Sequence, residues 1–277
     1  MTPAAFCRIL GTTILLTTLV SRSCAAETPT PLADWQFSAG EVLSSLDGPV
    51  PDWRVTLGPG VDVQPTYPGA KRYTIEPAGI VDLRYLDLAF LSDGEGIGVN
   101  ILRGQGYRAG VAISYDLGRN HHDDPRLAQL ANISPAAEPK LFAQTFLKVV
   151  VLTANMRKGL GGHDGVIGDV GAYMPLPIAP HAFLFVGPTI SLADSRYMKA
   201  YFGVDAAHAK ASGLPVFAPA GGLRETGLGA TAIYLLGDHW LLNADAAYQR
   251  LLGDAARSPI TEAKTQFTAD FNIGYRF

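Results

Sequence analysis

The chain has 277 residues with 30 Gly, 11 Tyr and 12 Phe, and its formal net charge is −3. A net charge so close to zero argues against nucleic acid as a partner. The only two cysteines, Cys7 and Cys24, lie near the start of the chain, so the rest of the sequence has no disulfide framework of the kind that small secreted domains use.

The first 26 residues have the pattern of a secretory signal peptide. Arg8 precedes an apolar run over 9–20, and small residues then lead to a predicted cleavage after Ala26. The run is too short to cross a bilayer about 30 Å thick as a helix, which disfavours a membrane anchor. Lipidation at Cys24 is an alternative, but the stretch "SRS" before it places an Arg within the recognition sequence.

Residues 27–52 form a lead-in that contains Pro and Ser, and we predict no strand there and a periplasmic location. Residues 53–277 contain no apolar stretch of about 18 residues, so the sequence predicts no transmembrane helix. An exported chain of this kind can still cross a membrane as a closed β-barrel, because closure satisfies the backbone groups of every strand.

Period-two alternation recurs along residues 53–277. It is clear in "VTLGPGVDV" (55–63), in "YRAGVAISYDL" (107–117) and in the closing "FTADFNIGYRF" (267–277). Alternation of apolar and polar side chains is typical of strands with one face toward lipid and one toward a polar interior. The sequence therefore predicts an all-β fold, a transmembrane antiparallel β-barrel in outer-membrane lipid with about 10 strands (8–12). The expected strands lie near 53–65, 77–91, 95–102, 106–117, 140–157, 164–175, 182–194, 222–236, 240–252 and 264–277.

The expected topology follows from placing Phe277 at the periplasmic rim and counting strands backward. The pair Gly237-Asp238 and the links 92–94 and 176–180 then lie on the periplasmic side, and 195–221 and 253–263 lie outside, as short turns and long loops do in such barrels. An aromatic girdle is expected at the periplasmic rim. Its members are Trp53, Trp240, Tyr275 and Phe277.

Segment 118–139 does not fit this topology, because it is long and yet lies on the periplasmic side of the count. Either the strand count is wrong by an odd number before this point, or a structured periplasmic loop lies here. In the second case Leu127 and Leu130 could share one face of a short helix begun at Pro125, and this face could bind a partner or plug the barrel mouth. The candidate partner-binding residues are His121, His122, Asp123, Asp124, Arg126, Leu127 and Leu130.

We find no pattern that predicts a catalytic, cofactor or metal site. The cluster His121 to Asp124 has suitable ligand types, but consecutive side chains diverge and a solvated loop is favoured. His239, Asp254 and Ser258 suggest a hydrolase, but His239 and Asp254 lie at opposite ends of one predicted strand. The sequence therefore predicts a protein that is not an enzyme.

Arg108, Asp116, Asp245 and Asp270 are expected to face the barrel interior. They could line a pore, or they could form a network of ion pairs that fills the lumen. Ten strands leave an interior between that of filled eight-stranded barrels and that of water-filled porins, and the filled lumen is favoured.

Several stretches resemble the MipA/OmpV family of outer-membrane proteins. They are "YPGAKRY", "GRNHHDDPRLAQL", "YFGVDAAHAKASGLPVFAPAGGLRE", "LLGDHWLLNADAAYQRLLGDAARSPI" and the closing "GYRF", and the resemblance extends over 53–277. The most specific stretch is "YQRLLGDAARSPI". A terminal aromatic such as Phe277 is also the signal that the barrel-assembly machinery of the outer membrane is thought to read.

The resemblance implies location more firmly than activity. The best-known member of the family is described as a scaffold for a lytic transglycosylase and a murein synthase, which implies a non-enzymatic scaffold that tethers peptidoglycan enzymes to the outer membrane. Other members are linked to adhesion, osmotic response or antibiotic uptake, so a narrow channel or an uptake or adhesion protein is the alternative. The family supplies no catalytic residues.

Overall fold

The alternating segments form antiparallel strands in the computed structural model, which describes Glu41 and residues 52–277. The predicted signal peptide 1–26 and nearly all of the lead-in 27–52 lie outside the described residues. The strands are β1 (Trp53–Pro65), β2 (Tyr73–Tyr85), β3 (Ala89–Ser92), β4 (Gly96–Gly104), β5 (Tyr107–Asp116), β6 (Ala136–Leu147), β7 (Val150–Lys158), β8 (Leu160–Gly161), β9 (Val166–Ala179), β10 (Ala182–Ala193), β11 (Gly222–Leu236), β12 (Trp240–Leu251) and β13 (Thr265–Arg276).

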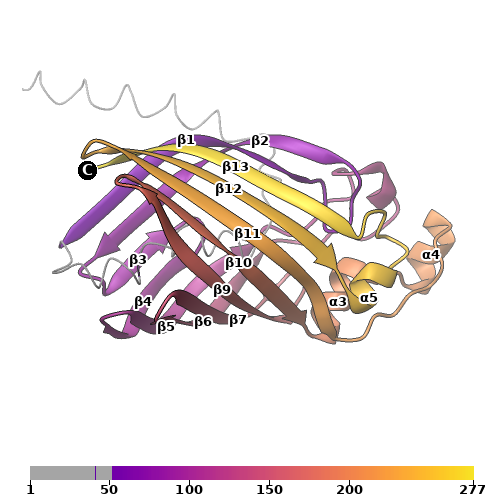
Figure 1. Cartoon of the computed structure of the whole chain (residues 1–277). Coiled ribbons are helices and arrows are strands. Elements are labelled where there is room, and N and C mark those ends of the chain that lie inside the picture. The colour runs from indigo at the N-terminus through magenta and orange to yellow at the C-terminus, as the bar shows by residue number, and fades with distance from the viewer. Residues whose placement is uncertain (1–40, 42–51) are drawn as a thin grey trace, which may run out of the picture.

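Twelve of these strands close into a barrel (Figure 1). Neighbours in sequence are paired around the ring, β1 pairs with β13, and β5 pairs with β6, so the described sheet returns on itself. The two-residue β8 only extends the edge beside β6. The predicted all-β antiparallel barrel is confirmed, and its strand number lies at the upper end of the predicted range.

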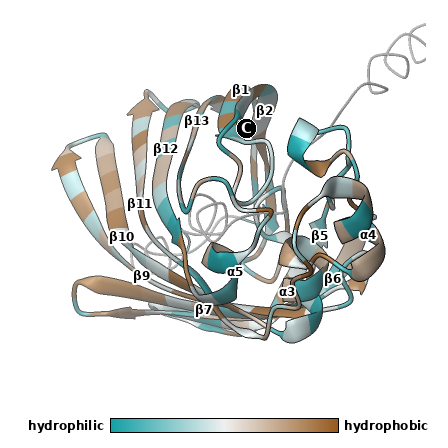
Figure 2. Cartoon of the chain, turned by 90° about the vertical axis from the view of Figure 1, so that its right-hand side faces the viewer, coloured by the Kyte–Doolittle hydropathy of each residue, from teal (hydrophilic) through white to brown (hydrophobic). Residues whose placement is uncertain are grey.

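The two faces of the wall differ as the alternation predicts. Large apolar side chains such as Ile113, Leu228 and Phe271 are exposed on the outer face, and bands of opposite hydropathy alternate along the strands in Figure 2. Polar side chains such as Arg108, Asp245 and Asn272 are buried inside. Among the described residues, no helix is long and apolar enough to span a membrane.

The two ends of the barrel differ in their connections. One end, which carries Phe277, has only short turns at 86–88, 105–106, 148–149, 180–181 and 237–239. At the other end lie the long connections 117–135, 194–221 and 252–264, with α3 (Ser195–Phe202), α4 (Ala206–Ser212) and α5 (Gly253–Arg257) (Figure 1). Outer-membrane barrels have short periplasmic turns and long outer loops, and by this rule the end with Phe277 is the expected periplasmic end, as it is called below.

Two tight turns correct the predicted strand list. The expected strand 140–157 is two strands, β6 and β7, joined at Lys148 with φ 60°. The expected strand 77–91 ends early, because Leu86 (φ 49°) and Asp87 (φ 51°) reverse the chain and β3 follows. Neither turn contains the Gly, Asn-Gly or Pro signals on which sequence reasoning depends.

The missed β6–β7 turn also corrects the position of 118–139. One additional strand between this segment and Phe277 moves it to the end that carries 195–221 and 253–263, opposite the predicted end. The link 92–94 likewise lies at the ends of β3 and β4 that point toward the long loops. The turns near 180 and 237 lie at the predicted periplasmic end.

Candidate functional site

The lumen is the most distinctive part of the molecule, because its charged side chains are buried and gathered into two clusters. The first lies toward the periplasmic end and is centred on Glu95, in the turn between β3 and β4. Glu95 pairs with Arg84 at 2.5 Å and with Arg108 on the other side. All three side chains are at most 5% exposed. Buried charges need such pairing, because an isolated ion loses its hydration without compensation.

Aromatic rings and a further carboxylate complete this Glu95 cluster. The guanidinium of Arg108 lies 5.7 Å from the ring centroid of Phe90 and 5.4 Å from that of Phe142. Glu41, from the segment before the barrel, lies 2.5 Å from Arg54 and 3.4 Å from Arg84. Strand arginines, two rings and Glu41 therefore fill the lumen near its periplasmic end.

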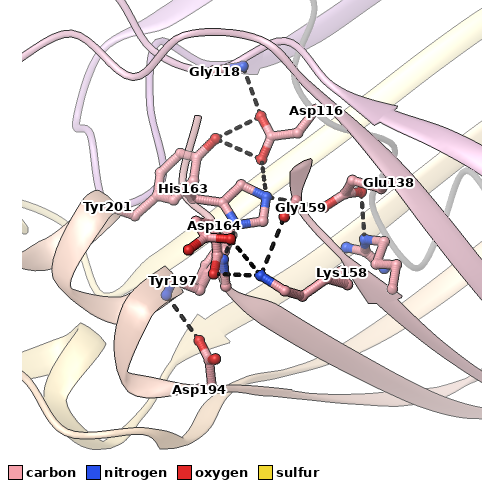
Figure 3. A network of polar contacts seen from close by, with 12 residues as sticks. Asp116, Gly118, Glu138, Lys158, Gly159, His163, Asp164, Asp194, Tyr197 and Tyr201 are labelled. Carbon is pink, nitrogen blue, oxygen red and sulfur yellow. Dashed lines mark hydrogen bonds and ion pairs between the residues drawn. The ribbon is translucent and has the colours of Figure 1, made fainter. Parts of the chain in front are cut away.

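The second cluster lies under α3 at the loop end and is centred on His163 (Figure 3). Its Nε2 atom lies 3.0 Å from Glu138 Oε1 and 3.3 Å from Asp116 Oδ2. The hydroxyl of Tyr201 donates to Asp116 at 2.6 Å, and the backbone N–H of Gly118 donates to the same carboxylate. Arg157 Nε lies 3.0 Å from the second oxygen of Glu138.

The hydrogen bonds of His163 decide what this His163 cluster can do. The side chains of His163, Asp116 and Glu138 are fully buried, and their ligand atoms lie within 4.8 Å of one another, which is suitable spacing for a metal ion. The backbone N–H of Gly165, however, donates to His163 Nδ1 at 3.0 Å. Nδ1 is therefore an acceptor, so a neutral ring carries its proton on Nε2. Nε2 then donates to the carboxylates and has no lone pair for a metal ion. The arrangement is therefore a structural hydrogen-bond network, called the polar lock below.

Helix α3 covers this lock with an apolar surface. Its residues Tyr197, Met198, Tyr201 and Phe202 are buried against Ile133, Ile167, Ala193, Leu251 and Ala255. The carboxylate of Asp194 accepts the N–H groups of Arg196 and Tyr197 and so caps the first turn of the helix. The hydroxyl of Ser258 donates to the carbonyl of Phe202 at 2.7 Å, which ties the end of the helix to the neighbouring loop.

Burial also affects titratable groups at this mouth. Desolvation raises the pKa of the Tyr197 phenol, and it lowers the pKa of the Arg119 guanidinium, which donates to the carbonyl of Tyr201 at 2.7 Å. Both shifts reflect exclusion of water beneath α3. The loop end of the lumen is thus closed by an apolar cap above a polar lock.

The four side chains predicted to face inward do face the lumen. Arg108 belongs to the Glu95 cluster and Asp116 to the His163 cluster. Asp245 accepts hydrogen bonds from Thr231 and Asn243, and Asp270 accepts one from Asn272 at 2.5 Å. Ion pairs of the predicted kind therefore surround Arg108, whereas Asp245 and Asp270 accept hydrogen bonds from neutral side chains.

The predicted partner-binding loop is folded onto other loops. Leu127 and Leu130 are buried against Tyr67, Ala70, Val204 and Ile260. Asp124 caps a short 3₁₀ helix over Pro125–Leu127 and accepts a hydrogen bond from Thr66 at 3.0 Å. The two leucines thus stabilise the loop from within.

The polar members of this loop hold its surface in place. His121 Nδ1 lies 2.7 Å from Asn132 Oδ1, and Asp123 accepts the N–H of Asn120 at 2.7 Å. His122 and Arg126 are exposed, and Arg126 donates to the carbonyl of Pro259 at 2.6 Å.

The four predicted girdle residues lie at the periplasmic end. The ring of Tyr275 contacts those of Trp240 and Phe277 with centroids 4.9 Å apart in each case, and Trp53 contacts Tyr85 at 4.7 Å. Their role at the membrane boundary stays a prediction.

The residues that suggested a hydrolase do not meet. His239 Nδ1 lies 2.9 Å from the carbonyl of Arg276 at the periplasmic end. Asp254 accepts the N–H of Ala220 at the loop end, and the Ser258 hydroxyl is bonded to a backbone carbonyl. These three side chains form no catalytic arrangement.

Sequence reasoning missed the centres of both lumen clusters. Glu95 was expected at the start of the strand 95–102, but it lies in the turn between β3 and β4, and Glu41 lies in a segment for which no contact was expected. Of the central residues, only His163 could have been singled out from the sequence, because it is a histidine in the short Gly-rich stretch "GGHDG" at the mouth of the barrel.

Comparison with known proteins points to the family that the sequence resembles. The model of the family described as MltA-interacting protein MipA matches residues 57–277. The outer membrane protein OmpV of Vibrio cholerae is 34% identical over 88 residues, which are 32% of this chain and 34% of OmpV, so the match spans about a third of that relative.

Solved outer-membrane barrels are similar only at a distance. OmpT of Vibrio cholerae has a TM-score of 0.35 at 10% identity, over 82% of this chain and 97% of OmpT. An anion-selective porin from Comamonas acidovorans has a TM-score of 0.38 at 10% identity, over 81% of this chain and 98% of the porin.

Proposed function

The chain belongs to the MipA family of outer-membrane proteins, and on this premise we propose that it is a non-enzymatic outer-membrane barrel that tethers partner proteins. The observation that carries this proposal is the filled lumen. Arg84, Arg108 and Arg157 are paired with carboxylates and at most 4% exposed. A barrel that conducts solutes needs water along its axis, whereas a scaffold only needs a stable wall and an exposed end.

We propose that the partners are a lytic transglycosylase and a murein synthase, and that they bind at the periplasmic end. The name of the family describes an MltA-interacting protein, and murein lies on the periplasmic side of the outer membrane. The short turns at this end expose Leu88 and Val149, which are 39% and 61% exposed, and Phe277 is 71% exposed. Exposed apolar side chains at a rim suit protein contacts. Phe277 is also the proposed contact for the barrel-assembly machinery.

The loop with His121, His122 and Arg126 has a different place in this proposal. It lies at the end opposite Phe277, so murein enzymes in the periplasm do not reach it. Its exposed side chains His122 and Arg126 are available to partners outside the cell, which is the adhesion form of the alternative function.

A pull-down from membrane extract tests the scaffold. We expect Leu88→Asp/Val149→Asp to lose the murein enzymes, because charge in an apolar contact is costly. The matched control is His122→Ala/Arg126→Ala at the other end, which should retain them. Heat-modifiable migration shows whether each variant is folded. Retention of the enzymes by the folded Leu88→Asp/Val149→Asp variant would contradict periplasmic docking.

A narrow channel or uptake protein is the second candidate, and one observation favours it. Ala78 faces the lumen on β2 yet is exposed, and Glu76 and Asp62 beside it are only partly buried. Solvent therefore reaches lumen-facing side chains of β1 and β2. Planar-bilayer recording separates the two functions: we expect no steady openings, and steady single-channel currents from the parent protein would favour the channel.

A further inference from the structure

The barrel wall has an opening beside β2. Strand β3 has only four residues and pairs with Asp82–Tyr85, the periplasmic part of β2. From Tyr73 to Ile80, β2 pairs with β1 alone, and no other strand of the described chain lies against its second edge. Across the gap, β5 continues to Asp116, beyond the end of β4 at Gly96. The strand pairing of the wall is therefore interrupted in its outer half, where β3 is too short to continue it.

The free edge of β2 is unsuited to pairing with another strand. The carbonyl of Val81 accepts the N–H of Asp93 at 3.1 Å, so Val81 directs its backbone toward the gap. Because backbone direction alternates along a strand, Ile75, Pro77 and Gly79 also face the gap. Pro77 has no N–H and so interrupts the row of donors at its centre, which is a common protection of edge strands. This argues against a protein strand as the occupant of the gap.

A groove of about 680 Å³ occupies the periplasmic side of this opening. It has the size of a small-molecule site. Its apolar lining includes Val81, Leu91, Ile97, Ile113, Pro135 and Ala137. Ile97 is 63% and Ile113 60% exposed, so both lie on the outer face of the barrel. A ligand that enters from this face comes from the lipid and must be soluble there.

One charged side chain lines the groove. Asp93 lies in the turn between β3 and β4, and its backbone carbonyl accepts the hydroxyl of Tyr115 at 2.9 Å. One carboxylate oxygen of Asp93 is buried without a hydrogen-bond partner. Among the described residues, no Lys, Arg or His forms an ion pair with it. Backbone N–H groups of Val81, Asp93 and Gly94 donate to this carboxylate but leave its charge unbalanced, and a cation would balance it.

We propose that this groove binds a cationic amphiphile, a membrane-soluble molecule with an apolar chain and one ammonium group. The apolar chain lies along Leu91, Ile97 and Ile113, and the ammonium group pairs with Asp93. Carbonyl groups of the unpaired β2 edge supply further acceptors. An amphiphile with a negative head group is repelled by the same carboxylate. The proposal does not depend on the scaffold function.

Photo-crosslinking in nanodiscs of neutral lipid tests this site. The two probes are a diazirine-bearing alkylammonium and a diazirine-bearing alkyl sulfate of equal chain length, and mass spectrometry maps labelling to the peptides with Ile97 and Ile113. We expect the cationic probe to label the groove about fivefold more, the effect of one partly exposed ion pair. Equal labelling by the two probes would mean that both label the barrel non-specifically from the surrounding lipid, and it would overturn the proposal.

Two variants and one competition assign the preference to Asp93 and the groove. Asp93→Asn should remove the preference for the cationic probe, whereas the control Asp238→Asn, in an exposed periplasmic turn, should keep it. Ile97→Trp should reduce labelling by both probes, because the ring fills the groove. If Asp93→Asn does not fold, competition on the parent decides: unlabelled alkylammonium should displace the cationic probe, and the alcohol of equal chain length should not. Persistent preference in folded Asp93→Asn, or equal displacement by the alcohol, contradicts the proposal.

Discussion

The two lumen clusters close the barrel by different physical means. The Glu95 cluster joins formal charges, with one carboxylate between Arg84 and Arg108. The His163 cluster holds two carboxylates beneath the apolar surface of α3: Glu138 pairs with Arg157, whereas Asp116 is satisfied by the Tyr201 hydroxyl, a backbone N–H and the His163 ring. The first depends on charge balance and the second on exclusion of water. We therefore expect loss of one partner to be more costly in the Glu95 cluster than in the His163 cluster.

Removing the charge of Glu95 is expected to have the largest effect. Glu95→Gln leaves Arg84 and Arg108 buried without their shared carboxylate, and breaking such a pair costs about 3–5 kcal/mol. The temperature at which the protein loses its heat-modifiable migration should fall markedly. The control is Glu262→Gln at an exposed position of the loop end. A melting temperature unchanged from the parent would show that the other carboxylates beside Arg84, Glu41 and Asp82, balance the arginines.

Removing one hydroxyl from the His163 cluster is expected to have a smaller effect. Tyr201→Phe leaves the stacked ring in place beside Tyr197 but removes the donor to both oxygens of Asp116. A buried acceptor that loses its partner costs about 1–3 kcal/mol. The measurement is the same thermal shift, compared with Tyr248→Phe on the exposed face of β12. If Tyr201→Phe destabilises the barrel more than Glu95→Gln, the proposed order of the two clusters is wrong.

The sequence predicts the features that depend on each strand alone, and it does not predict those that depend on unusual turns. The barrel and its inward residues Arg108, Asp116, Asp245 and Asp270 follow from local alternation, which is a property of each strand by itself. The turns at Leu86-Asp87 and Lys148 were missed because Leu86 and Lys148 are residue types that rarely adopt a positive φ. Both turns change the strand count, and the turn at Lys148, which lies between 118–139 and Phe277, decides the side on which that segment lies.

The clusters themselves could not be derived, because they join residues distant in the sequence. His163 meets Asp116 and Glu138 only when β5 and β6 pair and close the ring. Glu95 could be placed only with knowledge of the short β3. Leu127 and Leu130 were correctly seen as a pair, but what they pack against, Tyr67 and Ile260, comes from two other loops.

The smallest expected effect concerns a contact at the rim of the α3 cap. The carboxylate of Asp254 accepts the N–H of Ala220 at 2.7 Å and pairs with Arg257, and these two contacts, the backbone bond first, lower the pKa of Asp254. A lowered pKa means that the contact stabilises the folded loop fully above the ordinary Asp value of about 3.9. The contribution is lost as the pH falls through the lower pKa of the folded state. Asp254→Asn should therefore loosen 195–221 at pH 5 and make little difference near pH 2.

Pepsin cleavage within 195–221 provides the measurement for Asp254. The ratio of the cleavage rate of Asp254→Asn to that of the parent should exceed one at pH 5 and approach one as the pH falls toward 2. Taking the ratio at each pH removes the pH dependence of pepsin itself. Asp238→Asn, at the far end of the barrel, should give a ratio of one throughout. If the ratio for Asp254→Asn instead rises toward acid pH, the parent loop is protected best when Asp254 is protonated. The tether to Ala220 would then not depend on the charge of Asp254.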